Sequence, residues 1–239
     1  MLSFERTLDI LIEAAPNRIA LYNYAHIPAA FKPYTRVQEA DLSTSEASLK
    51  LLGLSIRRLS AAGYQYIGMD QFAQADDTLA VAQRRGLLHL ELTGFSTHAD
   101  CDLVGVGVSA IGNVGPTYSQ NSRTLKNYYD CLDHNTLPIA RGIELTADDL
   151  LRRAVIRALI CNSSVTKESL SISYLIDFDR YFEAELSDLR QFAELGLVEL
   201  NDFEIKVMPE GRLQVRNIAK VFDRYLRQDR QRRGYSRVI

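Results

Sequence analysis

The stretch "RIALYNYA", residues Arg18 to Ala25, is apolar at most successive positions and lacks regular alternation with polar residues. The stretch "YQYIGM", Tyr64 to Met69, has the same character. Short apolar runs of this kind are typical of strands buried on both faces, as in a parallel sheet covered by helices. Between them, Ser43 and Glu46 form an S-x-x-E capping box, and the helix that it opens runs to Gly63. This alternation of helix and strand predicts an α/β fold.

Downstream, the alternation of helix and strand continues. The sequence predicts a helix within 76–85, a strand at 87–92 ("LLHLEL"), a glycine-rich strand at 102–112 ("DLVGVGVSAIG") and a polar helix near 122–134. About four strands are too few to close a barrel, which usually has ~8. Residues 1–145 are therefore predicted to form either a small open sheet or part of a larger parallel-sheet domain.

From Thr146 onward the pattern becomes mostly helical. Thr146 is the expected N-cap of a helix that reaches Cys161, and a second helix is expected over 178–195, ended by Gly196. Residues 197–208 have the pattern of a β-hairpin. A last helix places its apolar residues on one stripe: Val215, Ile218, Val221, Phe222, Tyr225 and Leu226. This order predicts a winged-helix-like C-terminal domain over 146–239.

The charge distribution limits the classes of partner. From Gly211 to Ile239 there are nine Lys or Arg against two Asp, a balance of +7, which leaves the first 210 residues at −9. The basic end is either an anion-binding face or a solvated helix end whose cations complement the helix dipole. In winged-helix proteins the helix before the hairpin commonly enters the major groove. Here that helix is acidic and would repel phosphates, so no nucleic-acid partner is expected.

Cysteine usage and the apolar segments indicate the compartment. Cys101, Cys131 and Cys161 are odd in number and widely spaced, which predicts neither a disulfide framework nor a zinc or cluster site. This usage suits a reducing, cytoplasmic compartment. The first 15 residues carry acidic side chains where a signal peptide would be apolar, and glycines interrupt the uncharged run 103–122. Neither an export signal nor a membrane span is predicted.

Two features suggest where a ligand would bind. Gly105 and Gly107 indicate either close packing of the backbone or a flat ligand on the glycine face, with Ile111 as an apolar contact. Ala25 and His26 follow the first predicted strand, and Asp70 follows the second. The carboxyl ends of parallel strands collect ligands in open α/β sheets, so these strand ends are expected to converge.

Several long blocks of the chain resemble the oxygen-independent coproporphyrinogen III oxidases, radical S-adenosylmethionine enzymes of heme biosynthesis. The resemblance covers essentially the whole chain, and its blocks occur in the family's order. They are "ALYNYAHIP", "SAAGYQYIGMDQFA", "DDTLAVAQRRG", "GFSTHADCDLVGVGVSAIG", "TYSQN", "RGIELTADDLLRR" and "VFDRYLRQDRQRRGYSRVI".

The resemblance implies a partial parallel (βα) barrel of the radical-SAM type, followed by a helical C-terminal domain. It implies an oxidoreductase that uses S-adenosylmethionine and a [4Fe-4S] cluster, receives electrons from a donor, and works as a monomer. A 5′-deoxyadenosyl radical removes hydrogen from two propionates of coproporphyrinogen III, and loss of CO2 and an electron from each gives protoporphyrinogen IX.

Only the C-terminal portion of a family member is matched. The family's C-x3-C-x2-C cluster motif lies upstream of the matched region, and the three cysteines here cannot replace it, since a cluster needs several converging thiolates. We therefore expect that this chain by itself does not catalyse the family's reaction.

The family's S-adenosylmethionine contacts that fall in this stretch match Ala25 and Ile111. The resemblance assigns no catalytic residue here. Where the family has "GMDHFA", a proline and "DDEL", this chain has Gln71, Ala75 and Thr78. Gln71 can form hydrogen bonds but cannot carry a proton near neutral pH. The substrate's four carboxylates require cations, and three arginines are candidates: Arg36, Arg57 and Arg141.

Two competing functions remain at the level of sequence. The first is a heme chaperone of the same superfamily, which binds heme without decarboxylating a substrate. The second, from another class, is a winged-helix nucleic-acid binder.

Overall fold

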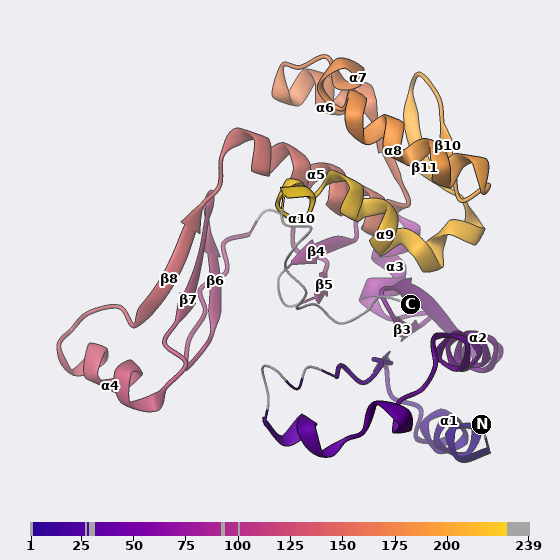
Figure 1. The fold of residues 1–239 in the computed structure, drawn as a ribbon, viewed down its shortest axis with the longest axis horizontal. Helices are drawn as coiled ribbons and strands as arrows, with labels where there is room; N and C mark the ends of the chain where they lie inside the picture. The colour runs from indigo at the N-terminus through magenta and orange to yellow at the C-terminus, as the bar shows by residue number, and fades with distance from the viewer. Residues whose placement is uncertain (1, 27, 29–31, 92–93, 100, 229–239) are drawn as a thin grey trace.

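The computed structural model describes residues 2–26, 28, 32–91, 94–99 and 101–228 of the 239-residue chain. Helices and strands are mixed along the chain (Figure 1). The first part comprises α1 (Leu2–Ala14), β1 (Arg18–Ala20), the 3-10 helices η1 (Lys32–Arg36) and η2 (Glu39–Asp41), α2 (Ser45–Ala61), β2 (Tyr64–Gly68), β3 (Gln71–Gln74) and α3 (Thr78–Arg84). The predicted α/β character is confirmed.

The sheet order in this part is β1-β3-β2, and both pairings are antiparallel. The expected parallel sheet is not found in these pairings, because β3 lies between the two predicted strands and is antiparallel to both. β1 and β2 nevertheless run in the same direction, since each is antiparallel to β3. The chain reverses directly after β2 through Met69 and Asp70, whose φ values are 47° and 65°. Tight turns with two positive φ values match the twist of a hairpin.

Local capping signals located the two ends of α2, one of them to within one residue. Gly63 ends α2 with φ +92°, as predicted. The N-cap of α2 is Thr44, not Ser43: the Thr44 side chain accepts the Ala47 N–H at 3.2 Å. The predicted N-cap is thus displaced by one residue, because Thr and Ser offer the same hydroxyl acceptor, and Ala47 has no side chain that could complete the predicted box.

The middle of the chain forms a short hairpin and a projecting arm. The hairpin is β4 (His89–Glu91) with β5 (Gly94–Ser96). The arm contains β6 (Ile111–Val114), β7 (Thr117–Asn121) and β8 (Ile139–Glu144), paired antiparallel in the order β6-β7-β8. The predicted polar helix, α4 (Leu125–Asp133), lies at the far end of the arm in Figure 1.

The predicted glycine strand over 102–112 is mostly a loop. Leu103 forms a single antiparallel bridge to Asn113, and regular strand begins only at Ile111. Gly107, with φ +105°, interrupts the extended backbone between those points.

The last part comprises α5 (Ala147–Asn162), β9 (Ser164–Thr166), α6 (Lys167–Tyr174), α7 (Phe178–Tyr181), α8 (Glu183–Glu194), β10 (Val198–Leu200), β11 (Glu204–Val207), η3 (Pro209–Gln214), α9 (Val215–Ala219), η4 (Lys220–Phe222) and α10 (Arg224–Gln228). Thr146 caps α5 in a reciprocal box with Asp149, and Gly196 follows α8 with φ +69°. The two predicted helix boundaries and the predicted hairpin, formed by β10 and β11, are confirmed.

Three features of this part differ from the prediction. The helix expected over 178–195 is broken at Phe182 into α7 and α8. The final helix is divided into short α and 3-10 segments, although Val215, Ile218 and Phe222 of its predicted stripe are buried. β9 and α6 were not predicted, and β9 completes an antiparallel sheet in the order β10-β11-β9.

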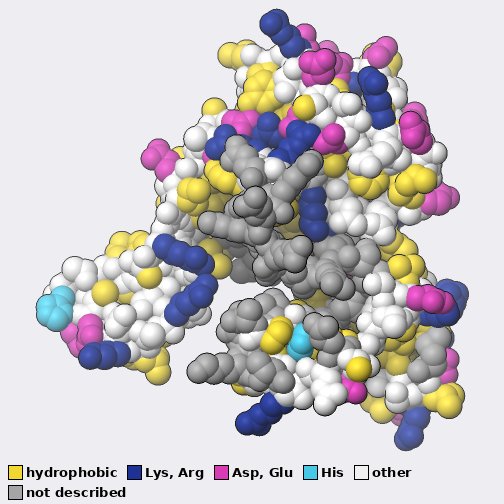
Figure 2. All heavy atoms as spheres, viewed as in Figure 1, with side chains coloured by type: hydrophobic (Ala, Val, Ile, Leu, Met, Phe, Trp, Pro, Cys, Tyr) yellow, Lys and Arg dark blue, Asp and Glu magenta, His cyan; other side chains and the backbone are white. Residues whose placement is uncertain are grey.

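Buried apolar residues form three clusters. The first joins α1, α2 and the β1-β3-β2 sheet. The second joins β2, β3, α3 and β5 with Cys161 of α5. The third is the largest and lies among α5, the β10-β11-β9 sheet, α7, α8, α9 and η4. The side of the molecule formed by α5 to α10 carries acidic and basic side chains intermixed (Figure 2).

Candidate functional site

Ala25 lies in the segment that follows β1, and the residue is partly buried. The Leu21 N–H of this segment donates to the Asp70 carbonyl at 2.9 Å. This hydrogen bond brings the end of β1 beside the turn that follows β2, whereas the convergence of Ala25 and His26 with Asp70 stays a prediction. A hollow of about 60 Å³ lies here between α1, α2 and residues 21–23, and Asp70 is among its lining residues.

Three rings pack together next to Ala25. The Tyr24 ring centroid lies 5.5 Å from that of Tyr34 and 5.9 Å from that of His26. The His26 ring is nearly parallel to the Tyr34 ring at 6.5 Å. Nδ1 of His26 is buried without a hydrogen-bond partner among the described residues. The rings hold the segment in place by packing, which is the usual role of a partly buried histidine beside aromatic residues.

Asp70 links the β2–β3 turn to the C-terminal part. Its carboxylate lies 3.3 Å from the Arg216 guanidinium of α9, which also donates to the Met69 carbonyl at 3.3 Å. Burial raises the pKa of Asp70, and the charge of Arg216 offsets this only in part. The Asp70 carboxyl therefore holds its proton more tightly than an exposed aspartate does.

Ile111 is the first residue of β6, and its side chain is 42% exposed. A Cβ added at Gly105 would lie 2.7 Å from the Ile111 carbonyl oxygen. Gly105 is thus required by close approach of the backbone, which supports the packing interpretation at that residue. Gly107 has open space around it and a positive φ, so its requirement is conformational.

The loop before Ile111 is fastened to the arm by side chains. The Asn121 amide donates to the carbonyls of Gly105 and Gly107 at 3.1 and 2.9 Å. The Tyr128 hydroxyl accepts the Gly107 N–H at 3.1 Å. These contacts fix the backbone from which the Ile111 side chain projects.

Ala25 and Ile111 therefore belong to different parts of the fold. The Leu21 N–H joins the segment of Ala25 to the β2–β3 turn, whereas Ile111 pairs with Gln120 of β7. An exposed branched side chain at Ile111 and a small one at Ala25 fit the contacts that S-adenosylmethionine needs, an apolar face and a close backbone approach. For a [4Fe-4S] cluster the residues do not fit.

The cysteines lie on separate elements. Cys101 directly precedes the loop that begins at Asp102, Cys131 is on α4, and Cys161 is on α5. Burial raises the pKa of the Cys161 thiol to about 12, the opposite of what a thiolate ligand requires. Within the described ranges, no three His, Cys, Asp or Glu side chains are grouped to hold a metal.

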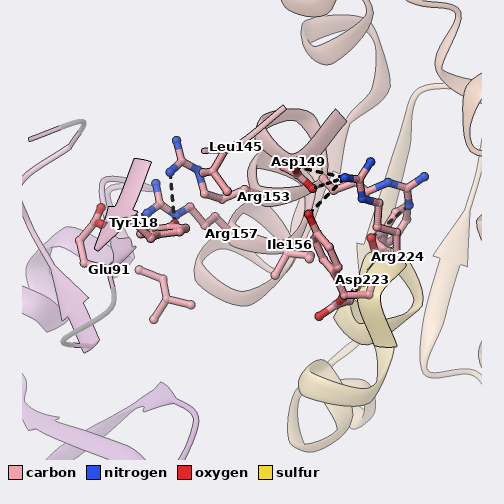
Figure 3. A pocket seen from close by; sticks show the side chains of 13 residues that line it. Glu91, Tyr118, Leu145, Asp149, Arg153, Ile156, Arg157, Asp223 and Arg224 are labelled. Atoms are coloured by element: carbon pink, nitrogen blue, oxygen red, sulfur yellow. Dashed lines mark hydrogen bonds and ion pairs between the residues drawn. The ribbon is translucent and has the colours of Figure 1, made fainter. Parts of the chain in front are cut away.

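Sequence reasoning missed a second cavity. It has a volume of about 350 Å³ and lies between β4, β7, α5 and the segment 222–225 (Figure 3). Its lining combines apolar and charged side chains: Leu90, Glu91, Tyr118, Leu145, Asp149, Arg152, Arg153, Ile156, Arg157, Phe222, Asp223, Arg224 and Tyr225. The spacing of Arg153 and Arg157 on one helix face was the available signal, but nothing in the sequence places β4 and β7 beside them.

Ion pairs cross one end of this cavity. Arg224 lies 2.6 Å from Asp148 and 3.2 Å from Asp149. Burial acts to raise the pKa of Asp149, but hydrogen bonds from the Thr146 side chain and backbone and the charge of Arg224 outweigh it, so the pKa lies below the ordinary value. Asp149 is therefore held as a carboxylate that closes this end.

The other residues singled out by the sequence lie outside this cavity. Arg36, Arg57 and Arg141 are exposed, and Arg141 donates to the Gln120 side chain at 2.8 Å. Gln71 begins β3 beside Gly94. The Thr78 hydroxyl accepts from Arg18 at 3.0 Å, and the Ala75 carbonyl accepts from Arg84 at 2.7 Å. Ala75 and Thr78 thus take part in structural contacts.

Among the described helices, none has both the length and the apolar composition needed to cross a lipid bilayer.

Comparisons with known proteins agree on one family. Residues 145–213 match the HemN C-terminal domain family. The chain is 45% identical to the oxygen-independent coproporphyrinogen III oxidase of Pseudomonas aeruginosa and 44% identical to that of Salmonella typhimurium, each over 99% of this chain. It covers 51% and 52% of those proteins, so it spans about half the length of the curated relatives.

A shorter relative is matched over most of its length. The oxygen-independent coproporphyrinogen III oxidase of Thermostichus vulcanus is 39% identical over 99% of this chain and 73% of its own sequence. The solved structure of HemN from Escherichia coli, described as a radical SAM enzyme, superposes with a TM-score of 0.90 at 43% identity, covering 94% of this chain and 52% of that one. The chain therefore belongs to the family of oxygen-independent coproporphyrinogen III oxidases.

Proposed function

We propose that this chain is the part of a radical S-adenosylmethionine coproporphyrinogen III oxidase that contacts the cosubstrate and the substrate. The observation that carries the proposal is the near-complete match of the chain to oxidases, at 43–45% identity and a TM-score of 0.90. In this reaction two of the substrate's propionates each lose one hydrogen atom, one CO2 and one electron and become vinyl groups. S-adenosylmethionine and a [4Fe-4S] cluster would supply the radical chemistry when bound.

The protein's share of the work is positioning and shielding. The Ile111 side chain is proposed to cover one face of the adenosyl group, and the lack of bulk at Ala25 lets the group approach the backbone. The loop contacts from Asn121 hold Ile111 in place. Both residues are proposed as S-adenosylmethionine contacts, and no catalytic side chain is assigned.

The proposed architecture has two units. Residues 1–145 would be the C-terminal part of a partial (βα) barrel, supported by the common direction of β1 and β2. Residues 146–239 would be a winged-helix-like unit, supported by the order α5, β9, α6, α8, β10, β11 and the sheet order β10-β11-β9. We further propose that the family member acts in the cytoplasm as a monomer and takes electrons from a separate donor.

The cosubstrate contacts are tested by titrating S-adenosylmethionine into the chain. Ile111→Asp is expected to weaken binding at least ~10-fold, because a carboxylate replaces an apolar contact. Val114→Asp is the matched control, since Val114 lies on the same strand at 49% exposure but points to the opposite face. Equal effects of the two substitutions would remove Ile111 from the site.

The activity is tested anaerobically. The chain is mixed with coproporphyrinogen III, S-adenosylmethionine, a reductant and the cluster-bearing N-terminal half of a family relative. Mass spectrometry is expected to show vinyl products from the mixture and none from either half alone. Retention of heme without vinyl products would favour the chaperone function, and salt-sensitive retention of DNA would favour a nucleic-acid binder.

A further inference from the structure

The cavity between β4, β7, α5 and the segment 222–225 contains one cation without a carboxylate partner among the described residues. Four arginines line the cavity, and three of them are neutralised: Arg152 by Asp148 and Glu185, Arg157 by Glu91, and Arg224 by Asp148 and Asp149. Arg153 forms no ion pair with any described residue. It contacts Tyr118 in two ways: Nη1 donates a hydrogen bond to the hydroxyl at 3.2 Å, and the guanidinium carbon lies 5.9 Å from the ring centroid.

Tyr118 fixes where this cation lies. The tyrosine projects from β7 toward α5, so Arg153 is held at the end of the cavity near Glu91 and Arg157 (Figure 3). Ile156 and Leu145 add apolar surface to the lining. A charged donor held at one end of a largely apolar cavity suits a ligand with a carboxylate on an apolar body.

The register of the arm relates this cation to the proposed cosubstrate contact. Ile111 pairs with Gln120, and Asn113 pairs with Tyr118. Residues two apart on a strand share a face, so Ile111 and Tyr118 are diagonal neighbours on one face of the arm, about 7–8 Å apart. A ligand bound by Arg153 and Tyr118 would therefore extend along the same face that presents Ile111.

We propose that Arg153, positioned by Tyr118, binds a propionate carboxylate of the tetrapyrrole substrate. The inference deepens the proposed function and rests on it. The same chemistry is available from the amino-acid carboxylate of S-adenosylmethionine. That group also carries an ammonium, and the cavity's acidic groups are already engaged: Glu91 with Arg157, Asp149 with Arg224, and Asp223 with backbone N–H groups. A simple carboxylate is therefore the better match.

The test is a direct binding measurement on the chain. Coproporphyrin III, the oxidised aromatic form of the substrate, is titrated by absorbance or fluorescence. Arg153→Gln is expected to weaken binding at least ~10-fold and Arg153→Lys less, because a planar guanidinium binds a carboxylate through two hydrogen bonds. Tyr118→Phe is expected to weaken binding roughly 2- to 5-fold by releasing the guanidinium. Arg190→Gln, at an exposed arginine of α8, is the matched control and should change nothing.

Two further titrations identify the group that is bound. The tetramethyl ester of coproporphyrin III should bind the wild-type chain and Arg153→Gln equally, because it carries no carboxylate. S-adenosylmethionine should also bind both equally. Weakened S-adenosylmethionine binding with unchanged coproporphyrin binding would overturn the assignment to the substrate.

The inference and the proposed function fail differently. Equal coproporphyrin affinities of the wild-type chain and Arg153→Gln, or no binding by the wild-type chain, would overturn the proposed role of Arg153. This holds even if the mixed halves form vinyl products. Absence of vinyl products would instead count against the proposed function, whatever the affinities. If Arg153→Gln does not fold, unchanged coproporphyrin III binding by both Arg153→Lys and Tyr118→Phe overturns the proposed role of Arg153.

Discussion

The region from α5 to α10 and the β6-β7-β8 arm place their apolar residues in opposite ways. In the first, the apolar side chains converge on one core in which Val155, Leu159 and Phe182 have no exposed surface. In the arm, Val114, Ile139 and Ile143 remain 47–49% exposed, and β8 is exposed along its whole length. Burial stabilises the first region, whereas backbone pairing and a few polar side chains define the second. Apolar side chains thus form a packed core in one region and remain exposed on the surface of the other.

The largest expected effect comes from Phe182→Ala. Phe182 has no exposed surface and lies 4.8 Å from Phe178 and 5.3 Å from Phe222 between ring centroids. We expect a loss of about 3–5 kcal/mol in the free energy of unfolding. Ile143→Ala on the arm should change it by about 0.5 kcal/mol or less. Urea denaturation followed by circular dichroism measures both, since the chain has no tryptophan. Equal losses would contradict the contrast between the two regions.

The second effect is steric. Gly105→Ala would place a Cβ 2.7 Å from the Ile111 carbonyl oxygen, so the loop must shift, at a cost of about 1–3 kcal/mol. Hydrogen exchange should speed up at the Leu103 and Asn113 amides, which pair with each other's carbonyls. Gly53→Ala is the control: its nearest neighbour is Arg57 Nη1 at 3.6 Å, and in a helix interior alanine should stabilise by up to ~1 kcal/mol. Unchanged exchange in Gly105→Ala would show that the loop is not closely packed.

A smaller loss is expected from Asn121→Ala. The substitution removes two hydrogen bonds to loop carbonyls and should cost roughly 1–2 kcal/mol. The effect should appear as local opening of the loop, with little change in hydrogen exchange in α8. Asn127→Ala, at an exposed position of α4, serves as the control. Faster exchange throughout α8 would mean that the arm and the C-terminal core open together.

The smallest effect depends on pH. The folded-state pKa of Asp149 lies below its ordinary value of 3.8. Its contribution to stability is therefore complete above the unfolded pKa and is lost as the pH falls through the folded one. Asp149→Asn should cost about 1 kcal/mol near neutral pH, and its difference from the wild-type chain should vanish at about pH 2. Denaturation midpoints across this range measure it; a constant difference would exclude the ionised carboxylate as the cause.

Local signals were reliable where one side chain decides the structure. Thr146, Gly63 and Gly196 were identified from residue type and spacing alone, because each caps or ends a helix within a few residues. The family resemblance added Ala25 and Ile111, which no local rule assigns.

Other features depend on distant parts of the chain. The Met69–Asp70 turn lacks the usual Asn-Gly signal, and it is braced by Arg216 from far along the sequence. The apolar character of β1 and β2 alone favoured a parallel sheet. In the same way, the Arg153–Tyr118 contact joins α5 to β7, and no sequence pattern links them.

The helix α5 serves two cores at once. Leu151, Val155 and Leu159 belong to the C-terminal cluster, while Cys161 belongs to the cluster with Ile67 and Phe95. A chain severed between 145 and 146 would thus deprive the upstream piece of part of its own interior. Calorimetry of the intact chain should accordingly show one melting peak spanning both regions, because neither can lose its order while the shared helix stays packed.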